Sequence, residues 1–317
     1  MRKQSKGASF ADLMVVGGVS ARLDRISGLL DWRPLEGLLS DVYASERGRP
    51  SYPALVHLRI LLLQGWYGLS DPGMEEALGD RLSFRRFVGL SLEERVPDHS
   101  SISRFRTLLA KRGLAEQVFA EVVRQLDARG VTIKQGTLID ATVIDAAAAE
   151  PSRQKGGGRS DADPDASWVK RPDGSARFGY KLHVAVDHGS NIVRRAILTP
   201  ANVADVDKGH DLVIGDERAV YADKAYVGPR MRARLGEAGI KDRVQHRRWK
   251  DRPLTPRQTL RNKLIGYIRG RVEGVFGTLK RSYGLARMRF MGILRNQAAT
   301  LLTLTSWNLA RAADRLA

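Results

Sequence analysis

Residues 137–145 read TLIDATVID and mark the point where the chain changes from helical to β patterns. Threonine, isoleucine and valine dominate this segment, so it predicts a β-strand. Asp140 lies inside it, flanked by Leu138 and Ile139 on one side and by Val143 and Ile144 on the other. Burying a carboxylate among such residues is costly unless it is paired or bound to a metal. We therefore expect a strand that carries a functional acid.

Before this strand the pattern is helical. Each segment combines a broad apolar face with a cap or stop signal such as Asp98 or Gly68. The first segment is followed by three short helices in series, which predict a helix-turn-helix-like unit, and we expect residues 1–130 to form an all-α DNA-binding or dimerisation region. The segments are PALVHLRILLLQGWYG (53–68), DPGMEEALGD (71–80), RLSFRRFVGL (81–90) and PDHSSISRFRTLLAKRG (97–113).

After this strand we expect an α/β domain with a mixed sheet over residues 131–317. The segment 181–199 predicts two strands joined by a turn, and AVYADKAY (219–226) predicts a further buried strand. Residues 150–177 are rich in Gly, Asp, Ser and Pro and predict a flexible loop or a solvated insertion. The remaining expected elements are helices over 229–237, 257–281 and 296–315 and a short strand over 243–246.

The charge predicts a polyanionic partner. The chain of 317 residues carries 53 Lys+Arg against 35 Asp+Glu, a formal net charge of +18. Residues 230–295 supply most of the excess, with 19 lysines and arginines against four acids. Nucleic acid is the first candidate and an anionic membrane surface the second. Because the chain has no cysteine, a disulfide framework and a thiolate zinc site are both excluded.

The apolar runs are too short to span a bilayer. LMVVGGV (13–19) lacks a convincing signal-peptide cleavage site, and ILLL (60–63) is far below spanning length. We therefore expect no membrane partner and a cytoplasmic protein.

A lone acid stands out in RGRVEGVFGTLKRSYG (269–284). At helical spacing, Val272, Val275, Phe276 and Leu279 share one apolar side that would pack on the sheet. Glu273 lies on a neighbouring stripe with Arg269 and Lys280, next to the apolar side. One interpretation is an ordinary helix ion pair, and the other is a ligand placed where the helix meets the sheet.

Asp140, Asp223 and Glu273 together predict a divalent metal site. Asp223 ends the strand segment AVYAD, where an aspartate also commonly caps the next turn. Three clustered carboxylates would repel one another unless a cation offset their charge. An all-oxygen site of this kind suits Mg²⁺ or Mn²⁺. The competing acids are expected to lie in turns or at helix starts: Asp145, Asp187, Asp205, Asp207 and Asp211.

The order of motifs resembles the DDE transposases of bacterial insertion sequences, most closely the IS-five family. The likeness covers nearly the whole chain and includes IDATVIDA, FGYKLHVAVD, TPANVAD, VYADKAY and RGRVEGVFGTLKRSYG. The resemblance identifies Asp140, Asp223 and Glu273 as the catalytic and metal-binding triad. Arg269 and Lys280 fill the Arg-x₃-Glu-x₆-Lys signature around the glutamate. The family's tyrosine, three residues before that arginine, is Gly266 here, with Tyr267 beside it.

The resemblance implies a ribonuclease-H-like fold and phosphoryl transfer with two Mg²⁺ ions, for which Mn²⁺ can substitute. Double-stranded DNA, as element ends and as target, is the implied partner, and a homodimer or larger assembly is expected because two ends must meet. A bacterial protein associated with the nucleoid is also implied. The implied phosphate contacts come from the basic residues around the glutamate: Arg269, Arg271, Lys280 and Arg281.

Two further DNA contacts stay open as alternatives. Arg104 and Arg106 would face a groove from the helix after Pro97, or would simply be solvated opposite its apolar stripe. Trp249, within HRRWK (246–250), would stack on an exposed base or lie at an ordinary surface.

The predicted function is a transposase that binds its terminal inverted repeats, cleaves DNA and joins the 3′ ends to a target. A catalytically silent repressor, a domesticated remnant, and a nuclease of the same fold without strand transfer are the alternatives.

Overall fold

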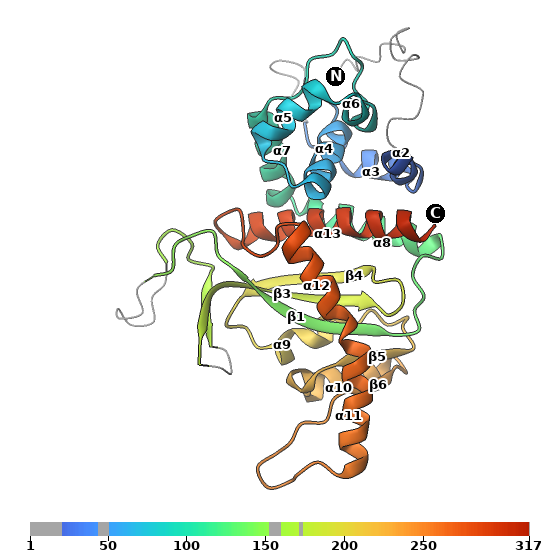
Figure 1. Cartoon of the computed structure of the whole chain (residues 1–317), viewed down its shortest axis with the longest axis vertical. Helices are drawn as coiled ribbons and strands as arrows, with labels where there is room; N and C mark the ends of the chain where they lie inside the picture. Colours follow the sequence, from blue (N-terminus) through green and yellow to red (C-terminus); the bar gives the residue numbers. More distant parts are fainter. Residues whose placement is uncertain (1–20, 44–50, 152–159, 171–173, 317) are drawn as a thin grey trace. The chain divides into compact units, whose positions relative to one another are not determined.

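The computed structural model describes residues 21–43, 51–151, 160–170 and 174–316 (Figure 1). Chain contacts divide it into a helical unit, residues 1–131 with 298–317, and a sheet unit, residues 132–297. The first expected boundary, after residue 130, lies within one residue of this division. The expected second domain also included residues 298–317, which cluster instead with the helical unit. The apolar run 13–19 lies outside the described residues.

The helical unit contains short helices whose ends follow the sequence signals. Asp98 caps α7 by accepting a hydrogen bond from the Ser101 amide, and α4 ends at Gly68, where φ is 65°. Both predictions are confirmed, because a left-handed residue favours glycine. The helices are α2 (Ala21–Gly28), α3 (Trp32–Leu38), α4 (Ala54–Tyr67), α5 (Asp71–Asp80), α6 (Leu82–Val88), α7 (His99–Lys111), α8 (Leu114–Ala128) and most of α13 (Ile293–Arg315).

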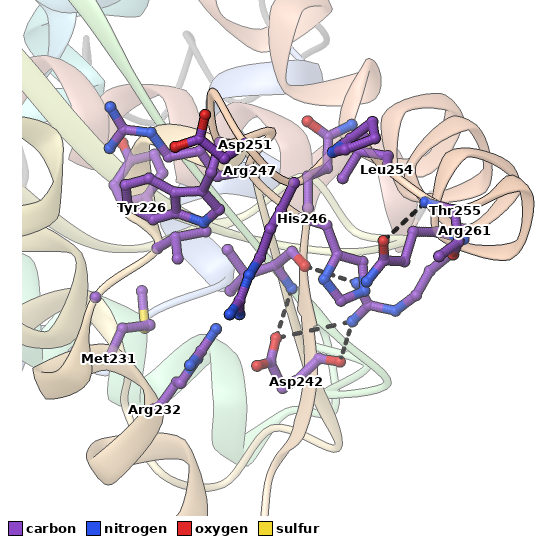
Figure 2. A pocket seen from close by; sticks show the side chains of 18 residues that line it. Tyr226, Met231, Arg232, Asp242, His246, Arg247, Asp251, Leu254, Thr255 and Arg261 are labelled. Carbon is purple, nitrogen blue, oxygen red and sulfur yellow. Dashed lines mark hydrogen bonds and ion pairs between the residues drawn. The ribbon is translucent and has the colours of Figure 1, made fainter.

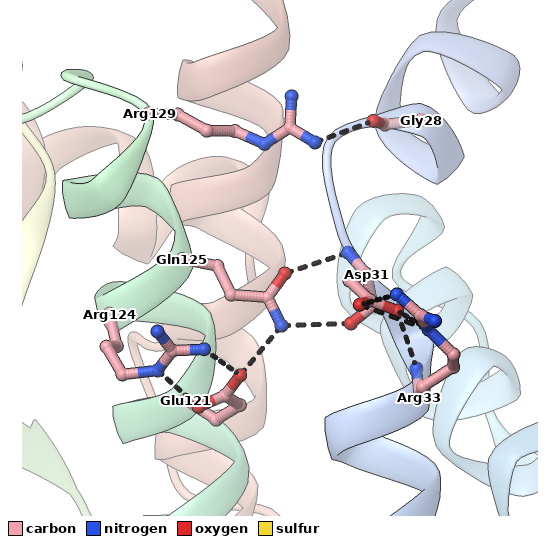
Figure 3. Close-up of polar contacts among 7 residues, drawn as sticks. All are labelled: Gly28, Asp31, Arg33, Glu121, Arg124, Gln125 and Arg129. Atoms are coloured by element: carbon pink, nitrogen blue, oxygen red, sulfur yellow. Dashed lines mark hydrogen bonds and ion pairs between the residues drawn. The ribbon is translucent and has the colours of Figure 1, made fainter.

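Polar contacts tie the ends of this unit together. The Gln125 side chain on α8 accepts from the Asp31 amide at 2.8 Å and donates to the Asp31 carbonyl at 2.9 Å (Figure 3). The same amide donates to Glu121, which also binds Arg124. The indole of Trp66 on α4 donates to the Ser306 carbonyl at 2.6 Å. These bonds hold α13 and the chain before α3 to the helices between them.

The sheet unit is built on a mixed six-stranded sheet, as expected. The strand order is β2-β3-β1-β5-β6. β4 also pairs with β3, along residues 180–186, whereas β2 pairs with residues 176–179. β1 is antiparallel to β3 and parallel to β5, and β5 is parallel to β6. The strands are β1 (Thr137–Asp145), β2 (Ser167–Lys170), β3 (Ala176–Asp187), β4 (Val193–Pro200), β5 (Ala219–Ala222) and β6 (Lys241–Val244).

The two faces of the sheet carry different side chains. Ile139 and Ala185, which pair across β1 and β3, belong to a buried apolar cluster with Val220, Ala222 and residues of the covering helices. Successive residues of a strand point to opposite faces. Asp140 therefore points away from this cluster. The covering elements are α9 (Asp205–Gly209), η1 (His210–Leu212), η2 (Lys224–Tyr226) and α10 (Pro229–Glu237).

The single helix expected over 257–281 is wrong. The structure has two helices, α11 (Pro256–Arg269) and α12 (Arg271–Ser282), which meet at Gly270. α11 contacts β5 and α12 contacts β1, and Gly270 between them keeps near-helical angles, with φ −52° and ψ −20°. The predicted apolar side of α12 is confirmed, because Val272, Val275, Phe276 and Leu279 are all buried.

Within the segment 150–177, for which a loop is expected, residues 160–166 form no helix or strand, but Ser167–Lys170 form β2. β2 pairs with β3 in antiparallel register. Asp163 is completely buried and accepts hydrogen bonds from the Tyr180 hydroxyl at 2.6 Å and the Gly292 amide at 3.1 Å. These distant partners order a segment whose composition is that of a loop. Residues 152–159 and 171–173 lie outside the described residues.

Among the described residues, no helix has both the length and the apolar character needed to cross a membrane.

Candidate active site

Strand register brings two of the predicted acids together. In the parallel pairing of β1 with β5, Thr137 faces Val220 and Leu138 faces Tyr221. Continuing this register by two residues sets Asp140 beside Asp223, which lies one residue beyond the end of β5. The two carboxylates also lie on the same face, because paired residues of neighbouring strands share a face. Asp223 caps η2 as well, accepting from the Ala225 amide at 2.8 Å.

Arg269 connects this pair to the third acid. Its Nη1 donates to Asp140 Oδ2 at 2.6 Å, and its Nη2 lies 3.6 Å from Glu273 Oε1. The Arg269 and Asp140 side chains are 18% and 15% exposed, whereas the Glu273 side chain is 70% exposed. The ion-pair interpretation of Glu273 is therefore confirmed for Arg269. The same guanidinium contacts Asp140, so Arg269 links the two acids.

The electrostatics of Asp140 reflect its burial. Desolvation raises the pKa of Asp140 to about 6, and the charges of Asp223 and Asp205 act in the same direction. Arg269 and the hydrogen bond from the Ala141 amide lower this pKa but do not offset burial. The same three acids raise the pKa of Tyr226, after a larger effect of burial. Negative charge is thus concentrated at this end of the sheet.

Asp205, which was expected only at a helix start, is a further acid whose charge acts on Asp140. It begins α9, as expected, but its Oδ1 lies 3.0 Å from Lys181 Nζ and 3.8 Å from His183 Nδ1. Burial lowers the pKa of His183 to about 4, so the lysine supplies the positive charge at neutral pH. A sequence signal for this contact exists: Lys181 and His183 lie two residues apart on one side of the buried strand β3, and such polar side chains need a partner.

The other competing acids have structural partners. Asp187 is completely buried at the end of β3 and accepts hydrogen bonds from Ile133, Lys134 and Ser190, so its predicted turn position is confirmed. Asp145 ends β1 and pairs with Arg177. Its expected position in a turn is therefore wrong, because it is the last residue of β1 and pairs with Gly179 of β3.

The donor set suits a divalent cation, although the carboxylates are not gathered around one in this conformation. Asp140, Asp223 and Glu273 offer hard oxygen ligands, and burial raises the pKa of Asp140 despite its contact with Arg269. Among the described residues, no group of three histidines, cysteines or acids is arranged to hold a metal ion. The Arg269 guanidinium lies between two of the candidate ligands.

Comparison with known families now adds to this geometry. Residues 131–309 match the family described as "Transposase DDE domain", and residues 18–108 match "Transposase domain (DUF772)". The first match covers more than half of the chain. The chain belongs to the DDE transposases. Its helical region followed by a mixed sheet with helices is consistent with the ribonuclease-H-like fold of such enzymes. No match to a solved structure was found.

The predicted phosphate-binding residues of the transposase differ in their surroundings. Arg271 and Arg281 are exposed on α12, and Arg271 Nη1 lies 3.4 Å from His188 Nε2. Lys280 is half-buried, and its Nζ donates to the Val143 carbonyl of β1 at 3.0 Å. This bond uses one of the three donors of the ammonium group. Arg269, the fourth residue of the set, is engaged with the acids.

Gly266, which stands where the family has a tyrosine, lies next to Gln245. A Cβ atom on Gly266 would lie 3.3 Å from Gln245 Nε2. Tyr267 does not take that place, because 82% of it is exposed.

Gln245 lines a pocket of about 520 Å³ between η2, β6 and the start of α11 (Figure 2). Its wall includes Tyr226, Trp249 and four arginines, Arg232, Arg247, Arg252 and Arg261. Trp249 is 57% exposed, and the Arg247 guanidinium lies 5.0 Å from the centre of its ring. Arg261 donates to the carbonyls of Val244 and Asp242 and so holds the wall together.

Arg104 and Arg106, the two candidate DNA contacts on α7, differ in exposure. Arg104 is exposed on α7. Arg106 binds Asp71 at 2.5 and 3.0 Å and Gln64 at 2.8 Å, and only 12% of its side chain is exposed. The guanidinium of Arg106 therefore joins α7 to α4 and α5, whereas that of Arg104 has no such role among the described residues.

The raised pKa of Asp140 predicts how stability depends on pH. The folded protein holds a proton at Asp140 between about pH 4 and pH 6, where the unfolded chain has released it. Stability must fall as the pH rises through this window. Asp140→Asn should therefore raise the free energy of unfolding by about 1–3 kcal/mol at neutral pH and by much less near pH 4. Urea unfolding at both pH values tests this, with exposed Asp207→Asn as the control; an equal effect at both would contradict it.

Proposed function

We propose that this transposase belongs to the IS-five group and acts on the ends of its own insertion sequence. It would bind the terminal inverted repeats, cleave the DNA and transfer the 3′ ends to a target site. The reaction would use two Mg²⁺ ions, for which Mn²⁺ can substitute. The observation that carries the proposal is the parallel register of β1 and β5, which sets Asp140 beside Asp223 when it is continued by two residues, with Glu273 linked to Asp140 through Arg269.

The three acids would hold the ions from two strands and a helix. When bound, such ions activate a hydroxyl nucleophile and stabilise the leaving oxygen of a phosphodiester. Asp140 and Asp223 offer a fixed pair of carboxylates, because each accepts a hydrogen bond from a nearby backbone amide. Glu273 is exposed, so its side chain is free to turn toward them. Arg269 and Lys280 would then position the DNA phosphate beside the acids.

Exposed basic residues support DNA as the partner. Arg271 and Arg281 on α12, and the arginine-rich pocket with Trp249, face solvent on the sheet unit. Contacts of this kind bind phosphate in a salt-dependent manner, and an exposed aromatic ring can stack on a base. Two element ends must be joined to one target, which is why we propose a dimer or a larger assembly on DNA.

The experiment uses DNA that carries the gene together with its flanking sequence. Purified protein is incubated with this DNA, with and without Mg²⁺, and new ends and joints are mapped by sequencing. Metal-dependent breaks at the element boundaries together with strand-transfer joints would support the transposition pathway. Binding without breaks would favour a catalytically silent repressor, and breaks without joints would favour a nuclease.

Arg104 and Arg106 should separate recognition from stability. Arg106→Ala breaks a partly buried ion pair and should lower the free energy of unfolding by about 2–4 kcal/mol. Arg104→Ala should change stability by less than about 0.5 kcal/mol and weaken DNA binding several-fold, if α7 faces a groove. Thermal unfolding and fluorescence anisotropy with an end-containing duplex measure the two effects. Unchanged DNA affinity in Arg104→Ala would remove α7 from the interface.

A further inference from the structure

One side chain lies between two of the acids that are proposed as metal ligands. The Arg269 guanidinium contacts Asp140 at 2.6 Å and lies 3.6 Å from Glu273, and the two acids come from different elements, β1 and α12. Asp140 and Arg269 are 129 residues apart in the chain, so this contact exists only in the folded protein. A divalent ion shared by the same two carboxylates would need the space that the guanidinium fills.

The guanidinium is held unequally. Its bond to Asp140 is short, its contact with Glu273 is longer than a hydrogen bond, and Glu273 is mostly exposed. Its Nε is buried and has no hydrogen-bond partner among the described residues. A buried N–H group without an acceptor is unfavourable. Another anion with several oxygen atoms could satisfy these donors more fully, and a phosphate fits the planar donor pattern of arginine.

The place of Arg269 in the chain suits a residue that moves. It is the last residue of α11, and Gly270 separates it from α12. A change in the Arg269 side chain therefore needs no rearrangement of the buried face of α12, which packs through Val272, Val275, Phe276 and Leu279.

We propose that Arg269 is an internal counterion that keeps divalent metal out of the site until DNA is present. In the free protein its single positive charge offsets part of the charge of Asp140 and Glu273. A DNA phosphate would draw the guanidinium away and leave both carboxylates to a metal ion. Metal and DNA would then each raise the affinity for the other, because both compete with the same contact. This inference rests on the proposed role of the acids as metal ligands.

Metal binding without DNA gives the first test. Mn²⁺ binding to the full chain is measured by electron paramagnetic resonance of the free ion, for wild type, Arg269→Gln, Arg269→Lys and Asp140→Asn. We expect Arg269→Gln to bind Mn²⁺ about tenfold more tightly than wild type. Arg269→Lys, which keeps the charge but not the two-point contact, should lie between them. The matched control is Arg257→Gln, an exposed arginine at the start of α11, which should bind like wild type.

A short duplex oligonucleotide provides the second test and works on wild type alone, so it holds even if the glutamine variant does not fold. Mn²⁺ bound by the DNA itself is subtracted using Asp140→Asn with the same duplex. The duplex should raise the Mn²⁺ affinity of wild type by about the factor gained in Arg269→Gln, and should add little in that variant.

The outcomes separate the inference from the function on which it rests. If Asp140→Asn binds Mn²⁺ as well as wild type, the acids are not the metal ligands and the proposed site is wrong. If Asp140→Asn loses binding but Arg269→Gln gains none, and DNA does not raise the affinity of wild type, the site stands and the counterion role is overturned.

Discussion

Replacing Asp140 with asparagine is expected to reduce DNA cleavage at least about a thousandfold, with DNA affinity changed no more than a few-fold. Asparagine keeps the shape of the side chain and its bond from the backbone, but it removes the negative charge that a metal ligand needs. Asp223→Asn and Glu273→Gln should have effects of the same order. The losses should not add if the three acids act as one unit, as we propose.

Cleavage is measured on a supercoiled plasmid that carries one element end, and binding on a labelled duplex of the same sequence. Asp145→Asn is the matched control, since Asp145 lies on the same strand and pairs with Arg177 instead of the site. Near-normal cleavage by Asp223→Asn or Glu273→Gln would remove that residue from the catalytic set. A loss of cleavage only in proportion to a loss of folded protein would point to a structural role.

The largest effect on stability is expected at Asp187. Its carboxylate accepts bonds from the Ile133 amide at 3.0 Å, the Lys134 amide at 2.8 Å and the Ser190 hydroxyl at 2.5 Å, and the residue is completely buried. These bonds join the chain before β1 to the turn between β3 and β4. Asp187→Ala leaves several buried donors without an acceptor and should lower the free energy of unfolding by about 3–5 kcal/mol.

Urea unfolding followed by circular dichroism measures the loss. Asp161→Ala, an exposed aspartate of the same unit, should change stability by less than about 0.5 kcal/mol. A loss at Asp187 of less than about 1 kcal/mol would mean that water replaces the carboxylate. β1 carries Asp140, so the same variant should also weaken metal binding, by disturbing the start of that strand.

Several features of the site follow from local pattern. The β-branched residues of 137–145 predict the strand that holds Asp140, and the helical spacing of Val272, Val275 and Phe276 predicts the buried side of α12. Caps are equally local, as at Asp98 and Gly68. Each depends on residues within about one or two turns, which is the range over which propensity and capping act.

Other features could not be predicted, because they depend on residues that are distant in the chain. The end of α11 at Gly270 is not marked in the helical periodicity, which continues through it, and α11 and α12 contact different strands. The local sequence shows only that Arg106 is basic. In the structure its side chain is mostly buried and binds Asp71 and Gln64. Asp163 belongs to a segment of loop-like composition that Tyr180 and Gly292 order.

The sequence by itself therefore determined the type of fold, the strand and helix that carry Asp140 and Glu273, and the basic character of the chain, since these follow from local periodicity and composition. Only the tertiary structure decided what each charged group touches. The Arg269 contact with Asp140 spans 129 residues, and no local pattern encodes such a pairing. It depends on the register of the strands and on where α11 ends, both of which are set by packing of the whole unit.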